Sequence, residues 1–102
     1  MKLLVVNPNT TASMTAKIGR AAEAVARAGT QIIATQPRSG PASIQGFHDV
    51  ANSLHGLLEV AERHPDVDAV VVACFDDTGV DALRCMFDGP VIGIGEAAFH
   101  AA

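Results

Sequence analysis

The fold is decided by residues 68–79, which read Asp-Ala-Val-Val-Val-Ala-Cys-Phe-Asp-Asp-Thr-Gly. The first half of this stretch is almost entirely apolar and rich in valine, which is typical of a strand buried on both faces of a sheet. The second half is polar and ends in glycine, and it leads into a further apolar stretch up to about Phe87. A central strand, a polar turn and a helix are therefore predicted in that order, and this is the repeating unit of a parallel α/β sheet.

The same alternation continues on both sides of this stretch. Short apolar runs predict strands at 3–6, 31–35, 68–73 and 91–94. Apolar residues three and four positions apart predict helices from Met14 to Val25 and from Ile44 to Ala61, and Glu96 begins a last helix. Right-handed crossovers then favour a four-stranded parallel sheet of flavodoxin-like order 2-1-3-4, with helices on both faces. We expect one α/β lobe spanning residues 1–102.

Composition limits the classes of partner. The chain has 102 residues, of which 49% are hydrophobic and only 4% aromatic, and its formal net charge is −4. Nucleic acids attract basic, aromatic surfaces, so we expect no nucleic-acid partner. No apolar run is long enough for a membrane helix, and Asn7-Pro8-Asn9 interrupts the apolar start too early for a signal peptide. Together with only two cysteines, these features predict a cytoplasmic protein without a membrane partner.

The predicted topology selects the loops that bind a ligand. In open parallel sheets, ligands bind beyond the carboxyl ends of the strands where the strand order reverses, here between the first and third strands. This rule selects residues 7–11 and 74–79, and the loop after the second strand lies at the same edge. The polar or reactive groups that these loops offer are Asn7, Asn9, Thr10, Thr11, Pro41, Ser43, Cys74, Phe75, Asp76, Asp77 and Thr78.

Cys74 is the reactive candidate among them. It is predicted to lie between a buried strand and a helix amino terminus, where the helix dipole favours a thiolate. The amides of Phe75 and Asp76 would form an anion site beside it. An inert, buried cysteine is about equally consistent with the sequence alone. For Asp77 we favour a cap on the following helix, shared with Thr78.

The remaining candidates favour ordinary structural roles. Cys85 falls within a helix beside apolar residues and is predicted to pack in the core. The histidines lack carboxylates or cysteines at metal-ligand spacing, so solvated or capping roles are favoured over metal binding; they are His48, His55, His64 and His100. Residues 93–98 match the dinucleotide pattern G-x-G-x-x-A, but they follow the fourth strand and not the first. We interpret these glycines as allowing a helix and a strand to approach each other closely.

Four blocks resemble the hydantoin and allantoin racemases of the aspartate/glutamate racemase superfamily. They are V-N-P-N-T-T-x-x-M-T from Val6, G-P-x-S-I from Gly40, A-C-F-D-D-x-G from Ala73, and P-V-I-G-I-G-E-A from Pro90. The resemblance implies an enzyme without a cofactor, in which two cysteines from two similar lobes face each other across the α-carbon of the substrate. Cys74 matches the first of these cysteines. Asn9, Thr10, Pro41 and the backbone after Cys74 match groups that hold the substrate.

The resemblance also implies that this chain is one lobe of two. Family members are about twice as long, and Cys85 does not match the partner cysteine. We expect a small carbon acid as substrate, such as a hydantoin, allantoin or an amino-acid-like compound. The predicted catalytic residue is Cys74; the predicted substrate-binding residues are Asn7, Asn9, Thr10, Pro41, Ser43, Phe75, Asp76 and Asp77. Three alternatives stay open: a homo-oligomer in which two copies of Cys74 face each other, an anion-binding lobe without turnover, and an acid–base or lyase reaction that needs only one thiol.

Overall fold

Four parallel strands alternate with four helices in the computed structural model, which describes residues 1–102. The elements are β1 (Lys2–Val6), α1 (Ala12–Val25), β2 (Gln31–Thr35), α2 (Phe47–Glu62), β3 (Ala69–Val72), α3 (Val80–Met86), β4 (Val91–Gly93) and α4 (Ile94–Ala101). The sheet has the order β2-β1-β3-β4, which confirms the predicted topology. In the central register, Leu4 of β1 lies opposite Ile33 of β2 and Val70 of β3.

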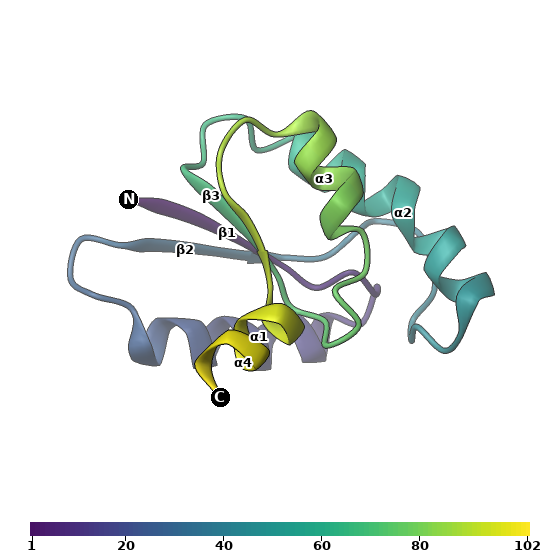
Figure 1. Ribbon diagram of the computed structural model, residues 1–102, viewed down its shortest axis with the longest axis horizontal. Helices are drawn as coiled ribbons and strands as arrows, with labels where there is room; N and C mark the ends of the chain where they lie inside the picture. Colours follow the sequence, from purple (N-terminus) through teal and green to yellow (C-terminus); the bar gives the residue numbers. More distant parts are fainter.

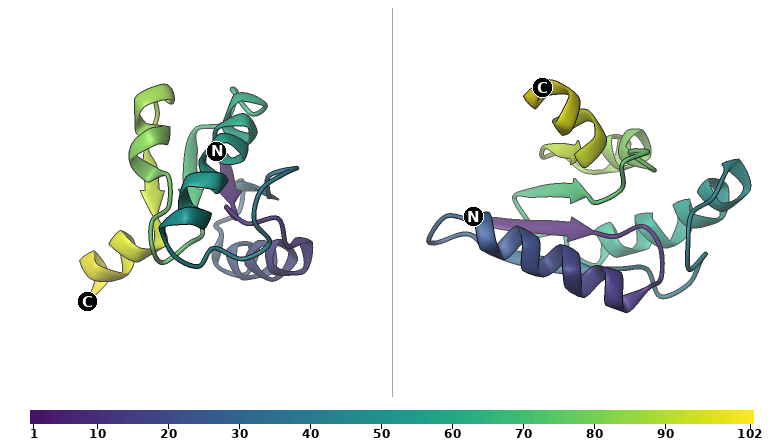
Figure 2. Two further views of the ribbon diagram at one scale, coloured as in Figure 1. Left: turned by 90° about the vertical axis from the view of Figure 1, so that its right-hand side faces the viewer. Right: turned by 90° about the horizontal axis from the view of Figure 1, so that it is seen from below.

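The helices form a layer on each side of the sheet. α2 and α3 cover one face, and α1 and α4 lie on the other (Figures 1 and 2). The main core lies under α2 and α3, because alternate residues of β1 and β3 point there to meet the apolar stripes of these helices. This core consists of Leu4, Val6, Leu57, Val60, Ala61, Val67, Val70, Val72, Val80, Leu83 and Val91.

The second helix is shorter than its apolar pattern predicts. α2 begins at Phe47 and not at Ile44, because Gly46 adopts a left-handed φ of 85° that ends the preceding loop. Phe47 is 92% exposed and so does not join the core. The apolar spacing at Ile44 and Phe47 continues through a loop and a helix start, where both side chains line a surface cavity. The last helix differs in the other direction, since α4 begins at Ile94, two residues before the predicted start.

The face shared by α1 and α4 keeps an apolar groove of about 510 Å³. α1 and α4 stand apart on this face, with the strands between them (Figure 2). The groove is lined by Leu3, Val5, Ile18, Ala21, Ala22, Val25, Ala26, Arg27, Thr30, Ile32, Val71, Ala73 and Ile94. No helix in the structure has the length and apolarity that crossing a membrane requires.

Candidate active site

Asn7 braces the loop that follows β1. Its side chain is buried, and its amide nitrogen donates to Asn9 Oδ1 at 2.8 Å, to Thr15 Oγ1 at 3.2 Å and to the Thr11 carbonyl at 3.4 Å. Its own carbonyl oxygen accepts from the Asn9 amide at 3.3 Å. The polar atoms of this side chain are therefore used inside the loop, and a contact of Asn7 with substrate stays a prediction.

The loops after β1 and β2 are tied together at the carboxyl edge of the sheet. The Thr10 amide donates to the Pro41 carbonyl at 3.0 Å, and the Thr11 hydroxyl donates to the Ala42 carbonyl at 2.7 Å. Asn9 and Thr10 are half-buried and remain accessible at this edge. Ser43 in the β2 loop is exposed, and its hydroxyl accepts from the Gln45 side chain at 3.3 Å.

Cys74 lies one loop further along the same edge. The Ala73 amide still pairs with the Val6 carbonyl at 2.8 Å, so the thiol emerges directly beyond the end of the central strands. The side chain is half-buried, packs partly on the core and lines a cavity of about 370 Å³. The other residues lining this cavity are Ile44, Gly46, Phe47, Val50 and Asp76. An accessible thiol at the switch point agrees with the position predicted for it.

A tight turn follows the thiol, and no helix begins there. The Asp77 amide donates to the Cys74 carbonyl at 3.0 Å, and α3 begins only at Val80, six residues after Cys74. Cys74 thus lies between a strand and a helix, as predicted, but the dipole of α3, which acts within about one turn of the helix terminus, does not support the thiolate as expected. The amides of Phe75 and Asp76 have no acceptor within the chain, and both residues are exposed. An anion site at Cys74 would thus be built from turn amides and not from a helix dipole.

Asp77 does not cap α3 as predicted. The N-cap of α3 is Gly79, in the left-handed region at φ 77°, and no side chain caps this helix. The Asp77 carboxylate accepts instead from the Gly95 amide at 2.9 Å and the Glu96 amide at 2.8 Å. Asp77 therefore caps α4, a helix that begins 17 residues later in the chain.

Sequence reasoning missed the role of Thr78. Its side chain is buried, and its hydroxyl lies 3.5 Å from Cys74 Sγ and 3.5 Å from Asp76 Oδ2. The sequence predicts that Thr78 shares the cap of α3, but its side chain makes no such bond. The only signal in the sequence is its position four residues after the thiol, inside a turn that brings the two side chains together.

Gly93 and Gly95 allow a close approach, as predicted, but what approaches them is the 74–77 turn and not a strand. A Cβ atom at Gly95 would collide with the Phe75 carbonyl and the Asp77 carboxylate, and one at Gly93 would collide with Asp77. The start of α4 is thus already filled by a carboxylate of the chain itself. A bound dinucleotide would need the same amides for its pyrophosphate, so the pattern match at 93–98 has this internal explanation.

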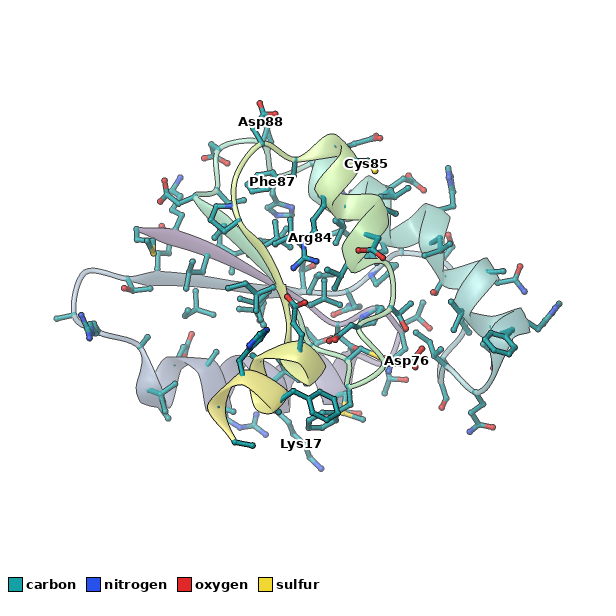
Figure 3. The ribbon with its side chains drawn as sticks, in the orientation of Figure 1. Lys17, Asp76, Arg84, Cys85, Phe87 and Asp88 are labelled. Carbon is teal, nitrogen blue, oxygen red and sulfur yellow. The ribbon has the colours of Figure 1, made fainter.

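The second thiol lies elsewhere. Cys85 is exposed on α3 and not packed as predicted. It lies on the outer side of α3, away from the turn that carries Asp76 (Figure 3). Since Cys74 is in that turn, the two thiols of this chain do not face one another.

The histidines make local contacts. His48 Nε2 lies 3.1 Å from Asn52, His55 pairs with Glu59 at 3.1 Å, and His64 Nδ1 lies 2.9 Å from the Val60 carbonyl. No three His, Cys, Asp or Glu residues are grouped where they could hold a metal ion. The contacts of His48, His55 and His64 are of the kind expected for solvated or capping side chains.

Comparison with known proteins shows which family this chain resembles. The family model described as Asp/Glu/Hydantoin racemase matches residues 3–102. The chain is 44% identical to a hydantoin racemase of Pseudomonas sp. (strain NS671) and 46% identical to one of Rhizobium meliloti, in each case over 100% of this chain and 42% and 43% of the relative.

Solved structures agree with this placement. The allantoin racemase from Klebsiella pneumoniae superposes with a TM-score of 0.95 at 49% identity, covering 100% of this chain and 42% of that protein. The allantoin racemase from Pseudomonas fluorescens gives a TM-score of 0.91 at 35% identity over 96% of this chain. The chain spans less than half the length of these relatives. By sequence and by fold, it belongs to the Asp/Glu/hydantoin racemase family.

Proposed function

We propose that this chain is one lobe of a racemase acting on hydantoins, allantoin or a related carbon acid, and that Cys74 transfers the proton. The observation that carries the proposal is the accessible thiol at the switch point, beside a cavity and two amides without acceptors. Relatives named as hydantoin and allantoin racemases support the substrate class. In these compounds the reacting C–H bond lies next to a carbonyl group, which makes its proton acidic.

The proposed step moves one proton and no other atom. The Cys74 thiolate takes the proton from the α-carbon, and the electron pair of the C–H bond is delocalised onto the adjacent carbonyl oxygen as an enolate. The amides of Phe75 and Asp76 are the donors available to that oxygen. Returning a proton from the opposite side inverts the carbon, and this requires a second acid on the other face.

We propose that the second acid belongs to a second lobe. Cys85 cannot act across the substrate from Cys74, because it lies on the outside of α3. A second lobe with its own thiol would also close the edge of the sheet and exclude water. The predicted binding groups Asn9, Thr10, Pro41 and Ser43 lie in the two tied loops at this edge and would hold the polar ring of the substrate from this side.

Racemisation by the protein containing both lobes tests the proposal. Replacing Cys74 by Ala should abolish inversion of a 5-substituted hydantoin, whereas the matched substitution Cys85→Ala should leave the rate within about twofold. Chiral chromatography follows the two enantiomers. Inversion that survives Cys74→Ala at the unmodified rate would refute the assignment of the thiol.

The exposed turn amides favour one rival function, an anion-binding lobe without turnover. This rival predicts that a hydantoin shields Cys74 from alkylation by iodoacetamide while the α-proton is not exchanged. Exchange of this proton above the rate without protein, dependent on Cys74, would exclude it.

A further inference from the structure

Asp77 joins the turn that carries Cys74 to the start of α4. Its two carboxylate oxygens accept separately from the Gly95 and Glu96 amides, at 2.9 and 2.8 Å. Both amides lie in the first turn of α4, where backbone donors have no acceptor within the helix. A carboxylate is the favoured group at this positive end of a helix. The contact links two segments that are remote in the sequence.

Both partners are shaped for this contact. Asp77 is the only residue other than glycine with a positive φ, at 52°, a region that Asp tolerates better than most residues. Opposite it, the space that a Cβ of Gly95 would take is filled by the Asp77 carboxylate and the Phe75 carbonyl. Neither the aspartate nor the glycine can therefore be exchanged without moving the turn.

The start of α4, to which Asp77 is bound, is itself held in place by contacts with α3 and β4. Glu96 Oε1 accepts from Arg84 Nη2 at 2.6 Å and lies 3.4 Å from the Gly93 amide. Arg84 also donates to the Val91 carbonyl at 2.8 Å. The start of α4 is thus fastened to α3 and β4, and it offers Asp77 a fixed point and not a mobile terminus.

We propose that Asp77 is a positioning residue for Cys74. By fixing the 74–77 turn on α4, its carboxylate sets the place of the thiol and the direction of the Phe75 and Asp76 amides. Direct contact with substrate is disfavoured, because both of its oxygens are occupied by α4. The catalytic consequence rests on the proposed function, whereas the anchoring of the thiol does not.

Two readouts test the anchoring without any turnover. In a Cys85→Ser background, the 102-residue chain is compared with its Asp77→Ala and Asp77→Asn variants. Amide hydrogen exchange of Gly95 and Glu96 is expected to accelerate at least tenfold in Asp77→Ala, and alkylation of Cys74 by iodoacetamide to accelerate several-fold as the turn loosens. Asp77→Asn keeps one acceptor oxygen and should give a smaller change in the same direction, which covers the case that Asp77→Ala fails to fold.

Asp68→Ala is the matched control. Asp68 Oδ2 also accepts from a backbone amide, that of Lys2 at 2.7 Å, but at the opposite edge of the sheet. This variant should leave Cys74 alkylation and the Gly95 and Glu96 amides unchanged. If both Asp77 variants alkylate at the parent rate, or if Asp68→Ala changes Cys74 as much as they do, the positioning role is overturned.

The catalytic readout is α-hydrogen exchange of a 5-substituted hydantoin. We expect Asp77→Asn to lower kcat more than tenfold while KM stays within about threefold, since misplacing a base affects the reacting step most. A rise in KM as large as the fall in kcat would point to direct binding of the substrate by Asp77 and would overturn the proposal. This exchange is measured with the protein containing both lobes. If that parent protein shows no exchange, the proposed function fails, and the alkylation and amide-exchange readouts still decide the anchoring.

Discussion

The buried Thr78 hydroxyl touches both Cys74 Sγ and Asp76 Oδ2, and a hydroxyl has only one proton to donate. With a neutral thiol, the S–H group can donate to Thr78 while the hydroxyl donates to Asp76. With a thiolate, the hydroxyl can turn and donate to sulfur. The same side chain can therefore accompany the thiol through both protonation states.

Replacing Thr78 by Val keeps the shape of the side chain and removes this donor. Because the thiolate loses a hydrogen bond, we expect Cys74 to be alkylated severalfold more slowly at neutral pH in a Cys85→Ser background. The rate of iodoacetamide labelling, followed by mass spectrometry, checks this. Labelling at the parent rate would show that the 3.5 Å contact has no effect on the thiol.

Asn7 has a structural effect that can be measured separately. Replacing it by Ala removes a buried NH2 group that has three acceptors within 3.4 Å, and it leaves the Thr15 hydroxyl and the Asn9 side chain without that partner. We expect a loss of about 1–3 kcal/mol in the free energy of unfolding, measured with urea. Asn52→Ala is the control, since that exposed amide contacts only His48, and it should cost less than about 0.5 kcal/mol. Equal costs would contradict the bracing role of Asn7.

These residue roles were only partly predictable from sequence. Cys74 and the polar loops follow from topology, because strand ends and the switch point can be located from apolar runs. The cap made by Asp77 was assigned to the wrong helix, because local spacing favours α3, whereas the partner amides at Gly95 and Glu96 are brought close only by the tertiary fold. Thr78 was missed for a different reason: its contacts with Cys74 and Asp76 are local, but they depend on the conformation of the turn, which residue spacing alone does not give.

Elements were predictable in type and order, and less so at their ends. The apolar spacing from Ile44 onward is real, but Gly46 has a positive φ of 85° and α2 starts after it. The pattern does not tell whether a side chain is buried: Ile44 and Phe47 line a surface cavity beside Cys74, and Phe47 is 92% exposed. Periodicity alone does not distinguish the two cases.

One pair of charges joins the first strand to the loop before β3. Lys2 Nζ lies 2.7 Å from Asp66 Oδ2, and this hydrogen bond lowers the pKa of Asp66 below its ordinary value of 3.8 and raises that of Lys2 above 10.5. The contribution of Asp66 to the free energy of unfolding is therefore complete above pH 3.8, and it is lost as the pH falls through the lowered pKa of Asp66. The contribution of Lys2 to the free energy of unfolding is complete below pH 10.5, and it is lost as the pH rises through the raised pKa of Lys2.

Asp66→Asn should therefore lower Tm slightly at pH 7 and have no effect at strongly acidic pH. Both side chains are exposed, at 42% and 65%, so a shift of only a few degrees is expected, smaller in about 1 M salt. Asp88→Asn is the control, as this exposed carboxylate has no ion pair. A shift that persists at high salt would show that the effect is not electrostatic.

At the scale of the whole molecule, the sheet face under α1 and α4 carries an exposed apolar groove, because these two helices leave part of the strands uncovered. The sequence predicts helices on both faces, but it does not say how far each helix covers the strands beneath it. In the structure α1 and α4 leave an apolar groove of about 510 Å³ between them. A groove of this kind is a surface to which apolar molecules adsorb.

The chain should accordingly bind the dye anilinonaphthalene sulfonate in its folded state. Ala21→Glu places a charge in the groove and should weaken the fluorescence of the bound dye several-fold. Ala24→Glu changes another exposed alanine of α1 that does not line the groove and should have little effect. Equal fluorescence from both variants would place the dye elsewhere.

The central claim is that Cys74 is a single base acting on one face of the substrate. It is tested most directly by incubating each enantiomer of a 5-substituted hydantoin with the chain in D₂O, and by following deuterium at the α-carbon together with chirality. The account predicts that one enantiomer exchanges its α-hydrogen faster than without protein, with retention of configuration, and that Cys74→Ala stops this exchange. Exchange that is undiminished in Cys74→Ala would contradict it.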